Sequence, residues 1–233
     1  MAHNPKGDKE QAIAYRGGHL QIIACAGSGK TETVSLRVAS IVKEGVEPAS
    51  IVAFTFTERA AAELKARIYQ KVEEAKGKDF LGRLGPLFVG TIHSYCFQML
   101  HNHVPEYGDY DVLDEHRHAG LLSRTYWEIG LDSLFDRKFA GIQDFKRVAD
   151  VVGNELIDPI RLKKCAFGPC YEKYLDMLGR YRVLTFQMII AEAVKALKDP
   201  EIFKRVHGPL RHLIVDEYQD INPAQEKLVQ LLA

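Results

Sequence analysis

The sequence predicts an α/β fold in which helices flank a parallel sheet, with an all-helical subdomain inserted into it. Three observations support this prediction. Strand-like apolar runs alternate with helix-like segments over residues 8–103, an order that produces parallel sheets. Residues 104–207 show no convincing strand, and a strand-like run returns at 211–215. We therefore expect one domain from residues 1–103 and 208–233, and a helical insertion at 104–207.

The individual elements follow from apolar runs and from residues that begin or end helices. Strands are expected at residues 19–24, 50–55, 87–90 and 211–215. Helices are expected at residues 8–15, 30–43, 57–76 and 95–103, and after Asn222. Asp8, Thr57 and Asn222 are candidate helix N-caps, and Pro223 suits a first helical turn.

The inserted segment contains four candidate helices, at about residues 114–129, 142–157, 170–182 and 184–198. Glycine and proline separate them. We expect the aromatic residues here to form the core of the insertion, although each could instead be a platform for stacking bases. They are Tyr126, Trp127, Phe135, Phe139, Phe145, Tyr171, Tyr174, Tyr181 and Phe186.

Composition restricts the class of protein. The chain has 233 residues, of which 46% are apolar and 27% charged, as in ordinary globular proteins. The 31 basic and 31 acidic residues cancel, so nucleic-acid binding would need a local patch. No apolar run approaches the ~20 residues that span a bilayer, and the polar first ten residues lack a signal-peptide core. A cytoplasmic location is therefore expected.

The four cysteines are widely spread. Cys165 and Cys170 form a C-x4-C pair that has no companion pair and no nearby histidine. Reduced thiols are the simpler interpretation, and a metal site is the alternative.

A glycine-bearing loop at residues 24–31, A-C-A-G-S-G-K-T, lies between an apolar run and a helix. Gly27 and Gly29 allow the backbone to wrap closely around phosphate oxygens, and the following helix presents its positive end to them. Lys30 supplies a charge for the β- and γ-phosphates, and the Thr31 hydroxyl is a candidate Mg²⁺ ligand. The usual motif begins with glycine where this chain has Ala24. A glycine-rich turn without a ligand is the alternative.

Two adjacent carboxylates, Asp216 and Glu217, follow the last predicted strand. Opposite a phosphate loop, Asp216 would hold Mg²⁺ across from Thr31. Glu217 would orient and deprotonate a water in line with the γ-phosphate. The alternative is that both are surface residues at the end of an edge strand.

These stretches together resemble the UvrD/Rep/PcrA group of superfamily 1 DNA helicases, and they occur in the family's order. The residues that carry the resemblance are D-x-x-Q-x-x-A at 8–14 (Q motif), the loop at 24–31 (motif I), V-A-F-T-F-T-E-R-A-A-A-E-L-K-A-R-I at 52–68 (motif Ia), G-T-I-H-S-Y-C at 90–96 (motif Ib) and L-I-V-D-E-Y-Q-D-I-N-P-A-Q at 213–225 (motif II). The resemblance implies a P-loop NTPase domain of the RecA-like type, interrupted by a helical insertion.

The resemblance also implies roles for individual residues. ATP would be contacted by Gln11, Ala26, Gly27, Ser28, Gly29, Lys30, Thr31 and Gln219, with Gln11 on the adenine and Gln219 coupling nucleotide state to the site. Lys30, Asp216 and Glu217 would be catalytic, and Thr31 and Asp216 would hold Mg²⁺. Single-stranded DNA, or a single-/double-strand junction, would be contacted by Phe56, Thr57, Thr91 and His93; for His93 a structural role is the alternative.

The chain departs from the family in several places. Cys25 stands where many relatives have glycine, and Glu32 where relatives often have arginine. The segment 184–190 lacks the family's acidic residues, so no function is assigned to it. The motif III strand and the second RecA-like domain are not in these 233 residues. We therefore expect an incomplete sheet, and weak ATP hydrolysis by this part alone.

The expected function is the ATP-binding part of a DNA translocase or helicase. A helicase–nuclease subunit of the AddA/RecB kind, and a nucleotide-binding regulatory module without motor activity, are alternatives. RNA instead of DNA as the track also stays open.

Overall fold

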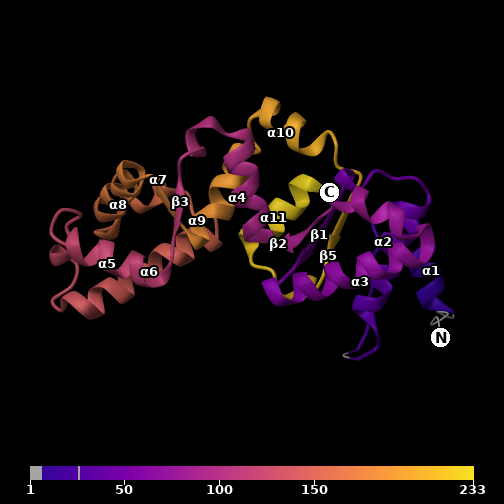
Figure 1. Cartoon of the computed structure of the whole chain (residues 1–233). Coiled ribbons are helices and arrows are strands. Elements are labelled where there is room, and N and C mark those ends of the chain that lie inside the picture. Colours follow the sequence, from indigo (N-terminus) through magenta and orange to yellow (C-terminus); the bar gives the residue numbers. More distant parts are fainter. Residues whose placement is uncertain (1–6, 26) are drawn as a thin grey trace. The chain divides into compact units, whose positions relative to one another are not determined.

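The computed structural model describes residues 7–25 and 27–233. The chain divides into two compact units, whose helices and strands are labelled in Figure 1. The first contains the residues up to Thr91 together with Pro209–Asp220, and the second contains Ile92–Gly208 and Ile221–Ala233. The predicted domain limits, at residues 103 and 207, stay a prediction. In the described part of the chain, no helix is both long and apolar enough to cross a membrane.

The first unit is built on a parallel sheet, as predicted. Its strands are β1 (Ile51–Thr55), β2 (Phe88–Thr91) and β5 (His212–Val215), in the order β2-β1-β5. Val52 is paired with Phe88 on one side and with Leu213 on the other. All five residues of the central strand β1 are buried, which explains why it appears in the sequence as an unbroken apolar run.

The α-helices of this unit, among the described residues, are α1 (Asp8–Ala14), α2 (Lys30–Lys43) and α3 (Glu58–Lys76). The helices α2 and α3 pack together, and Val38, Ile41, Leu64 and Ile68 form a core with Ile51 of the sheet. The predicted cap of α3 is confirmed, because the Thr57 hydroxyl accepts a hydrogen bond from the Ala60 N–H. The cap of α1 is Gly7 instead of Asp8, which is the first helical residue.

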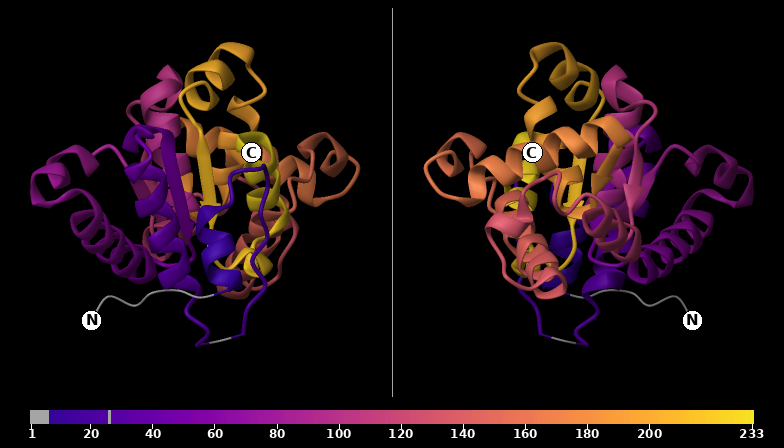
Figure 2. Two further views of the ribbon diagram at one scale, coloured as in Figure 1. Left: turned by 90° about the vertical axis from the view of Figure 1, so that its right-hand side faces the viewer. Right: turned by 90° about the vertical axis from the view of Figure 1, so that its left-hand side faces the viewer.

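The strand predicted at residues 19–24 is not formed. The segment is coil, drawn without an arrow in Figure 2, and Ile23 is 88% exposed. A strand needs a neighbour that accepts and donates its backbone hydrogen bonds. Among the described residues β5 pairs only with β1, so its other edge is open and the sheet is incomplete there. The apolar run therefore indicated a strand, but in the described chain it is unpaired although the edge of β5 is open.

The second unit is mainly helical. Its helices are α4 (Ile92–His103), α5 (Glu115–Arg124), α6 (Lys138–Asn154), α7 (Pro159–Leu162), α8 (Phe167–Tyr181), α9 (Phe186–Ala196), α10 (Pro200–His207) and α11 (Pro223–Leu232). The predicted start of α11 is confirmed, since Asn222 caps it in a capping box and Pro223 is its first residue.

The prediction of an all-helical insertion is wrong in one detail. Two short strands, β3 (Asp111–Leu113) and β4 (Val183–Thr185), form a parallel pair. Each has only three residues, too few to show the alternation that identifies a strand in a sequence. Their pairing joins segments far apart in the chain, so no local pattern predicts it.

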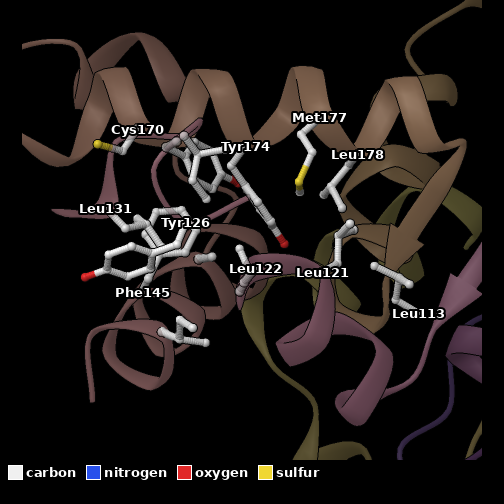
Figure 3. Packing of buried hydrophobic residues seen from close by; sticks show 14 of the residues in the cluster. Leu113, Leu121, Leu122, Tyr126, Leu131, Phe145, Cys170, Tyr174, Met177 and Leu178 are labelled. Carbon is white, nitrogen blue, oxygen red and sulfur yellow. The ribbon is translucent and has the colours of Figure 1, made fainter. Parts of the chain in front are cut away.

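The aromatic residues of the insertion are only partly in its core. Tyr126, Phe145 and Tyr174 are buried in the cluster shown in Figure 3, where they pack with Leu122 and Leu131. Other aromatic side chains are exposed, in contrast to the prediction: Trp127 (65%), Phe139 (81%), Tyr181 (55%) and Phe186 (49%). Periodicity does not distinguish these from core positions, because each flanks a turn or a helix end.

A buried histidine should make this unit sensitive to acid. His118 is 5% exposed and its Nε2 lies 2.8 Å from the Tyr174 hydroxyl. Burial, and then the nearby Lys146 ammonium, lower the pKa of His118 to about 4, while Glu115 opposes this shift. A histidine whose folded pKa lies below its unfolded value binds its proton preferentially in the unfolded state. Stability is therefore lost as pH falls from 6.5 towards 4.

We expect the free energy of unfolding to fall by roughly 2 kcal/mol between pH 7 and pH 5 from this histidine alone. Urea unfolding at the two pH values measures it. The double variant His118→Leu/Tyr174→Phe removes the histidine without leaving the tyrosine hydroxyl unpaired, and it should show a smaller loss. An equal loss in both proteins would contradict the assignment.

Candidate nucleotide and nucleic-acid site

The glycine-bearing loop leads directly into α2. Gly27 has φ 74° and Gly29 has φ 89°, conformations that residues with a Cβ rarely adopt. Gly29 is the N-cap of α2 and no side chain caps the helix, so N–H groups of its first turn stay available to an anion. Ala26, predicted to contact ATP, lies outside the described residues.

Ser28 supplies a test of whether a phosphate fits this loop. Its hydroxyl oxygen is buried, and it has no hydrogen-bond partner within the described chain. Leaving a buried polar group unpaired costs about 1–3 kcal/mol, so such groups usually have a ligand or water as partner. A phosphate oxygen would accept the hydrogen bond from this hydroxyl, and the residues present therefore fit an anion.

The loop lysine meets the carboxylate predicted to act with it. Lys30 Nζ lies 3.8 Å from Glu217 Oε1 and 3.5 Å from the Ala24 carbonyl oxygen. The sheet explains this meeting of distant residues. The Asp216 N–H, just after β5, donates to the Phe54 carbonyl at 2.9 Å and so fixes the end of the strand. Lys30 and Glu217, almost two hundred positions apart in the chain, are thereby brought into contact.

The backbone of Glu217 has φ 52°, in the left-handed region that disfavours residues with a side chain. Strain of this kind persists where the surroundings hold it, and it is common at functional sites. Gln219 Nε2 donates to Glu217 Oε2 at 2.6 Å. The Glu217 carboxylate is therefore held between Lys30 and Gln219, one partner at each oxygen.

Asp216 lies beside this pair and is electrostatically coupled to it. Burial and the neighbouring Glu217 carboxylate raise the pKa of Asp216, whereas a hydrogen bond from the Glu217 N–H and the Lys30 charge lower it. Thr31 is the second residue of α2 and is half-buried. A hydroxyl, a carboxylate and phosphate oxygens are the hard ligands that suit Mg²⁺.

The helix α1 brings a residue to the loop that the sequence did not indicate. A Cβ on Gly29 would lie 3.1 Å from Lys9 Nζ, so the Lys9 ammonium lies against the loop. Gln11 is exposed. Its predicted contact with the adenine stays a prediction. The sequence hinted at Lys9 only because it lies two residues before Gln11, the predicted adenine contact.

Glu32 is engaged elsewhere. Its Oε1 lies 3.2 Å from Lys71 Nζ on α3, and the same ammonium pairs with Glu74. The residue that replaces the family's arginine therefore joins α2 to α3 in this structure.

The predicted DNA contacts occupy different environments. In the first unit, Phe56 is 57% exposed just after β1, Thr57 caps α3, and Thr91 is buried with its hydroxyl donating to Glu58 at 2.9 Å. In the second unit, the ring of His93 stacks on Phe186, with centroids 3.6 Å apart. Burial lowers the pKa of His93 to about 4, so the ring is neutral at pH 7.

Phe186 was expected in the core of the insertion, with base stacking as the alternative, and no function was assigned to its segment. It is half exposed and begins α9, directly after β4. An exposed aromatic ring at the end of a parallel strand was the available signal.

A parallel sheet, a glycine-bearing loop at a helix N-terminus and an acidic pair after a neighbouring strand together define an α/β protein of the P-loop type. Within that class, the chain belongs to the family described as UvrD/REP helicase N-terminal domain, whose sequence pattern matches residues 6–233.

Characterised relatives are similar over the whole of this chain. It is 32% identical to the ATP-dependent DNA helicase UvrD1 of Mycobacterium tuberculosis, over 98% of this chain and 30% of the relative. It is 30% identical to the ATP-dependent DNA helicase PcrA of Staphylococcus epidermidis, over 100% of this chain and 32% of the relative. It is 28% identical to the ATP-dependent DNA helicase Rep of Escherichia coli, over 100% of this chain and 34% of the relative. The chain thus spans about a third of the length of these relatives.

Proposed function

We propose that this chain is the ATP-binding part of an ATP-dependent single-stranded DNA translocase or helicase. The observation that carries the proposal is the contact of Lys30 with Glu217, in a loop whose buried Ser28 hydroxyl has no partner among the described residues. This arrangement combines a cationic cradle for phosphates with a carboxylate next to it. The family and the names of the relatives, all ATP-dependent DNA helicases, agree with it.

In this proposal each residue of the site has a separate role in phosphoryl transfer. The loop N–H groups, Ser28 and Lys30 hold the phosphates and stabilise the charge that develops on them. Thr31 and Asp216 hold Mg²⁺, which neutralises phosphate charge when bound. Glu217 orients a water and takes its proton, and Gln219 keeps the Glu217 carboxylate in place.

DNA is the proposed track. The exposed ring of Phe56 offers a surface on which bases of any identity can stack, as a translocating motor requires. The half-exposed Phe186, stacked on His93, offers a second such surface in the other unit. Thr57 would meet the backbone through its hydroxyl. The buried Thr91 would act by holding Glu58 instead of touching DNA. A cytoplasmic location goes with this proposal.

The decisive experiment is a steady-state ATPase assay of the full-length protein with and without single-stranded DNA. Strong stimulation is expected, because nucleotide and DNA sites are coupled in a motor. Residues 1–233 alone should hydrolyse ATP about 10³–10⁵-fold more slowly, the contribution typical of arginines supplied from elsewhere. A full-length protein that binds ATP without DNA stimulation would favour a regulatory module, and stimulation by RNA alone would change the track. Rapid turnover by residues 1–233 would contradict the need for a second domain.

A further inference from the structure

Hydrogen bonds from arginine side chains help to hold the helix α1 against α2. Helix α1 has seven residues and none of them is buried. A helix of this length is not stable without outside contacts. Arg37 of α2 supplies two of them, since its Nη1 donates to the carbonyl oxygens of Ala12 at 2.6 Å and Tyr15 at 2.7 Å. These carbonyls belong to the end of α1, where the helix itself provides no donors.

A second arginine, Arg16, lies two residues after α1 and ties this part of the chain to the far end of α2. Arg16 makes a two-pronged contact with the Glu44 carboxylate, at 2.7 and 3.0 Å, and donates to the Ser40 hydroxyl at 2.9 Å. It also donates to the Ile13 carbonyl at 2.6 Å. We call Arg16, Arg37 and Glu44 the arginine clamp. It fixes α1 against the same helix whose first turn carries the phosphate loop.

The clamp has a consequence at the other end of α1, where Lys9 lies against Gly29 of the loop. Lys9 is half-buried, and the described residues provide it with no salt bridge. Lys30, by comparison, is paired with Glu217. The Lys9 ammonium is therefore a cation beside the uncapped first turn of α2, close in sequence to the Ser28 hydroxyl, which is buried and has no hydrogen-bond partner among the described residues.

We propose that Lys9 is a second cationic contact for the triphosphate of the nucleotide, and that the arginine clamp positions it. This inference rests on the proposed ATP-binding function and adds a residue to that site. A cation at hydrogen-bonding distance from a phosphate makes a charge-assisted hydrogen bond. A lysine ammonium has three N–H donors and can therefore bind phosphate oxygens in several orientations. Because Lys9 is only half-buried, solvent screens part of this attraction.

Nucleotide affinity of the full-length protein tests the proposal. Lys9→Gln should weaken ATP binding about tenfold, and binding of AMP much less, because AMP has no β- or γ-phosphate. Lys9→Arg should retain most of the affinity. The matched control is Lys43→Gln, an exposed lysine at the other end of α2, about 20 Å along the helix from the loop. It should bind ATP as the wild type does.

A double-mutant cycle tests the positioning role of the clamp. Arg37→Met should weaken ATP binding by a similar factor, because α1 is released from α2. In the Arg37→Met background, Lys9→Gln should then have little further effect, since the lysine is no longer held at the loop. Independent, multiplying effects of the two substitutions would overturn the role of the clamp.

The results separate this inference from the function on which it rests. If wild-type protein does not bind ATP, or binds it equally well after Lys30→Ala, the proposed ATP site is wrong. If Lys30→Ala weakens binding but Lys9→Gln binds ATP as Lys43→Gln does, the ATP site stands and the role of Lys9 is overturned. Equal weakening for ATP and AMP by Lys9→Gln would also overturn it, because the contact would not be to the outer phosphates.

Discussion

Replacing Lys30 by alanine in the full-length protein is expected to reduce ATP turnover by about 10³-fold. Lys30 is the only lysine of the loop, and its ammonium lies 3.8 Å from Glu217 Oε1, at the point where the proposed phosphate loop meets the acidic pair. Removing a group that stabilises developing charge in an enclosed site costs about 10²–10³ in rate, and in the proposed site Lys30 also binds the phosphates of the ground state. The measurement is steady-state hydrolysis at saturating DNA over a range of ATP concentrations.

The fold should survive this substitution. The side chains of Lys30 and Glu217 are 29% and 38% exposed, so the ion pair contributes little to stability. Circular dichroism and the unfolding midpoint should match the wild type. Normal turnover by a folded Lys30→Ala protein would refute the assignment of the phosphate loop.

Glu217→Gln should separate nucleotide binding from chemistry. The amide keeps the shape of the side chain and can still accept the hydrogen bond from Gln219, but it cannot take a proton from water. General-base catalysis contributes about 10²–10⁴ in rate, so turnover should fall by that factor. ATP affinity should stay within a few-fold of the wild type, since the loop and Lys30 are unchanged.

Single-turnover hydrolysis and equilibrium binding of ATP together measure this separation. Gln219→Ala is the companion variant, because it removes the hydrogen bond that holds the Glu217 carboxylate but leaves the carboxylate itself. It should lower turnover less than Glu217→Gln does. Turnover by Glu217→Gln equal to the wild type would show that another group activates the water.

The two variants should therefore differ in a recognisable way. Lys30→Ala affects both binding and hydrolysis, whereas Glu217→Gln affects hydrolysis alone. A protein in which both substitutions only weaken ATP binding would fit a nucleotide-binding module better than a motor. The comparison thus tests the proposed function as well as the roles of the residues.

Much of the site was predictable because its chemistry is local in the sequence. The loop at residues 24–31 specifies its own geometry through Gly27 and Gly29, and the helix that follows begins at Lys30 as expected. The caps at Thr57 and Asn222 were likewise predictable, because a cap is a contact between residues three apart. The parallel order of the strands followed from the alternation of apolar runs and helices.

Contacts between distant segments were not predictable in this way. The sequence could not show that Lys9 lies against Gly29, because that depends on how Arg37 and Arg16 fix α1 to α2. It also could not show the pairing of β3 with β4, or the stacking of His93 on Phe186. Each of these depends on the packing of elements that are far apart in the chain.

The coil segment at residues 19–24 shows where the local sequence pattern and the tertiary structure disagree. Its apolar residues are typical of a strand, but a strand is a property of a pair, and in the described chain β5 offers an edge without a partner. The amino-acid order determined the family, the backbone of the glycine-bearing loop and the position of the acidic pair after a strand, because these are encoded by neighbouring residues. Tertiary packing decided which side chains meet at the loop and which strands exist, because hydrogen bonds and ion pairs between remote segments form only once the chain has folded.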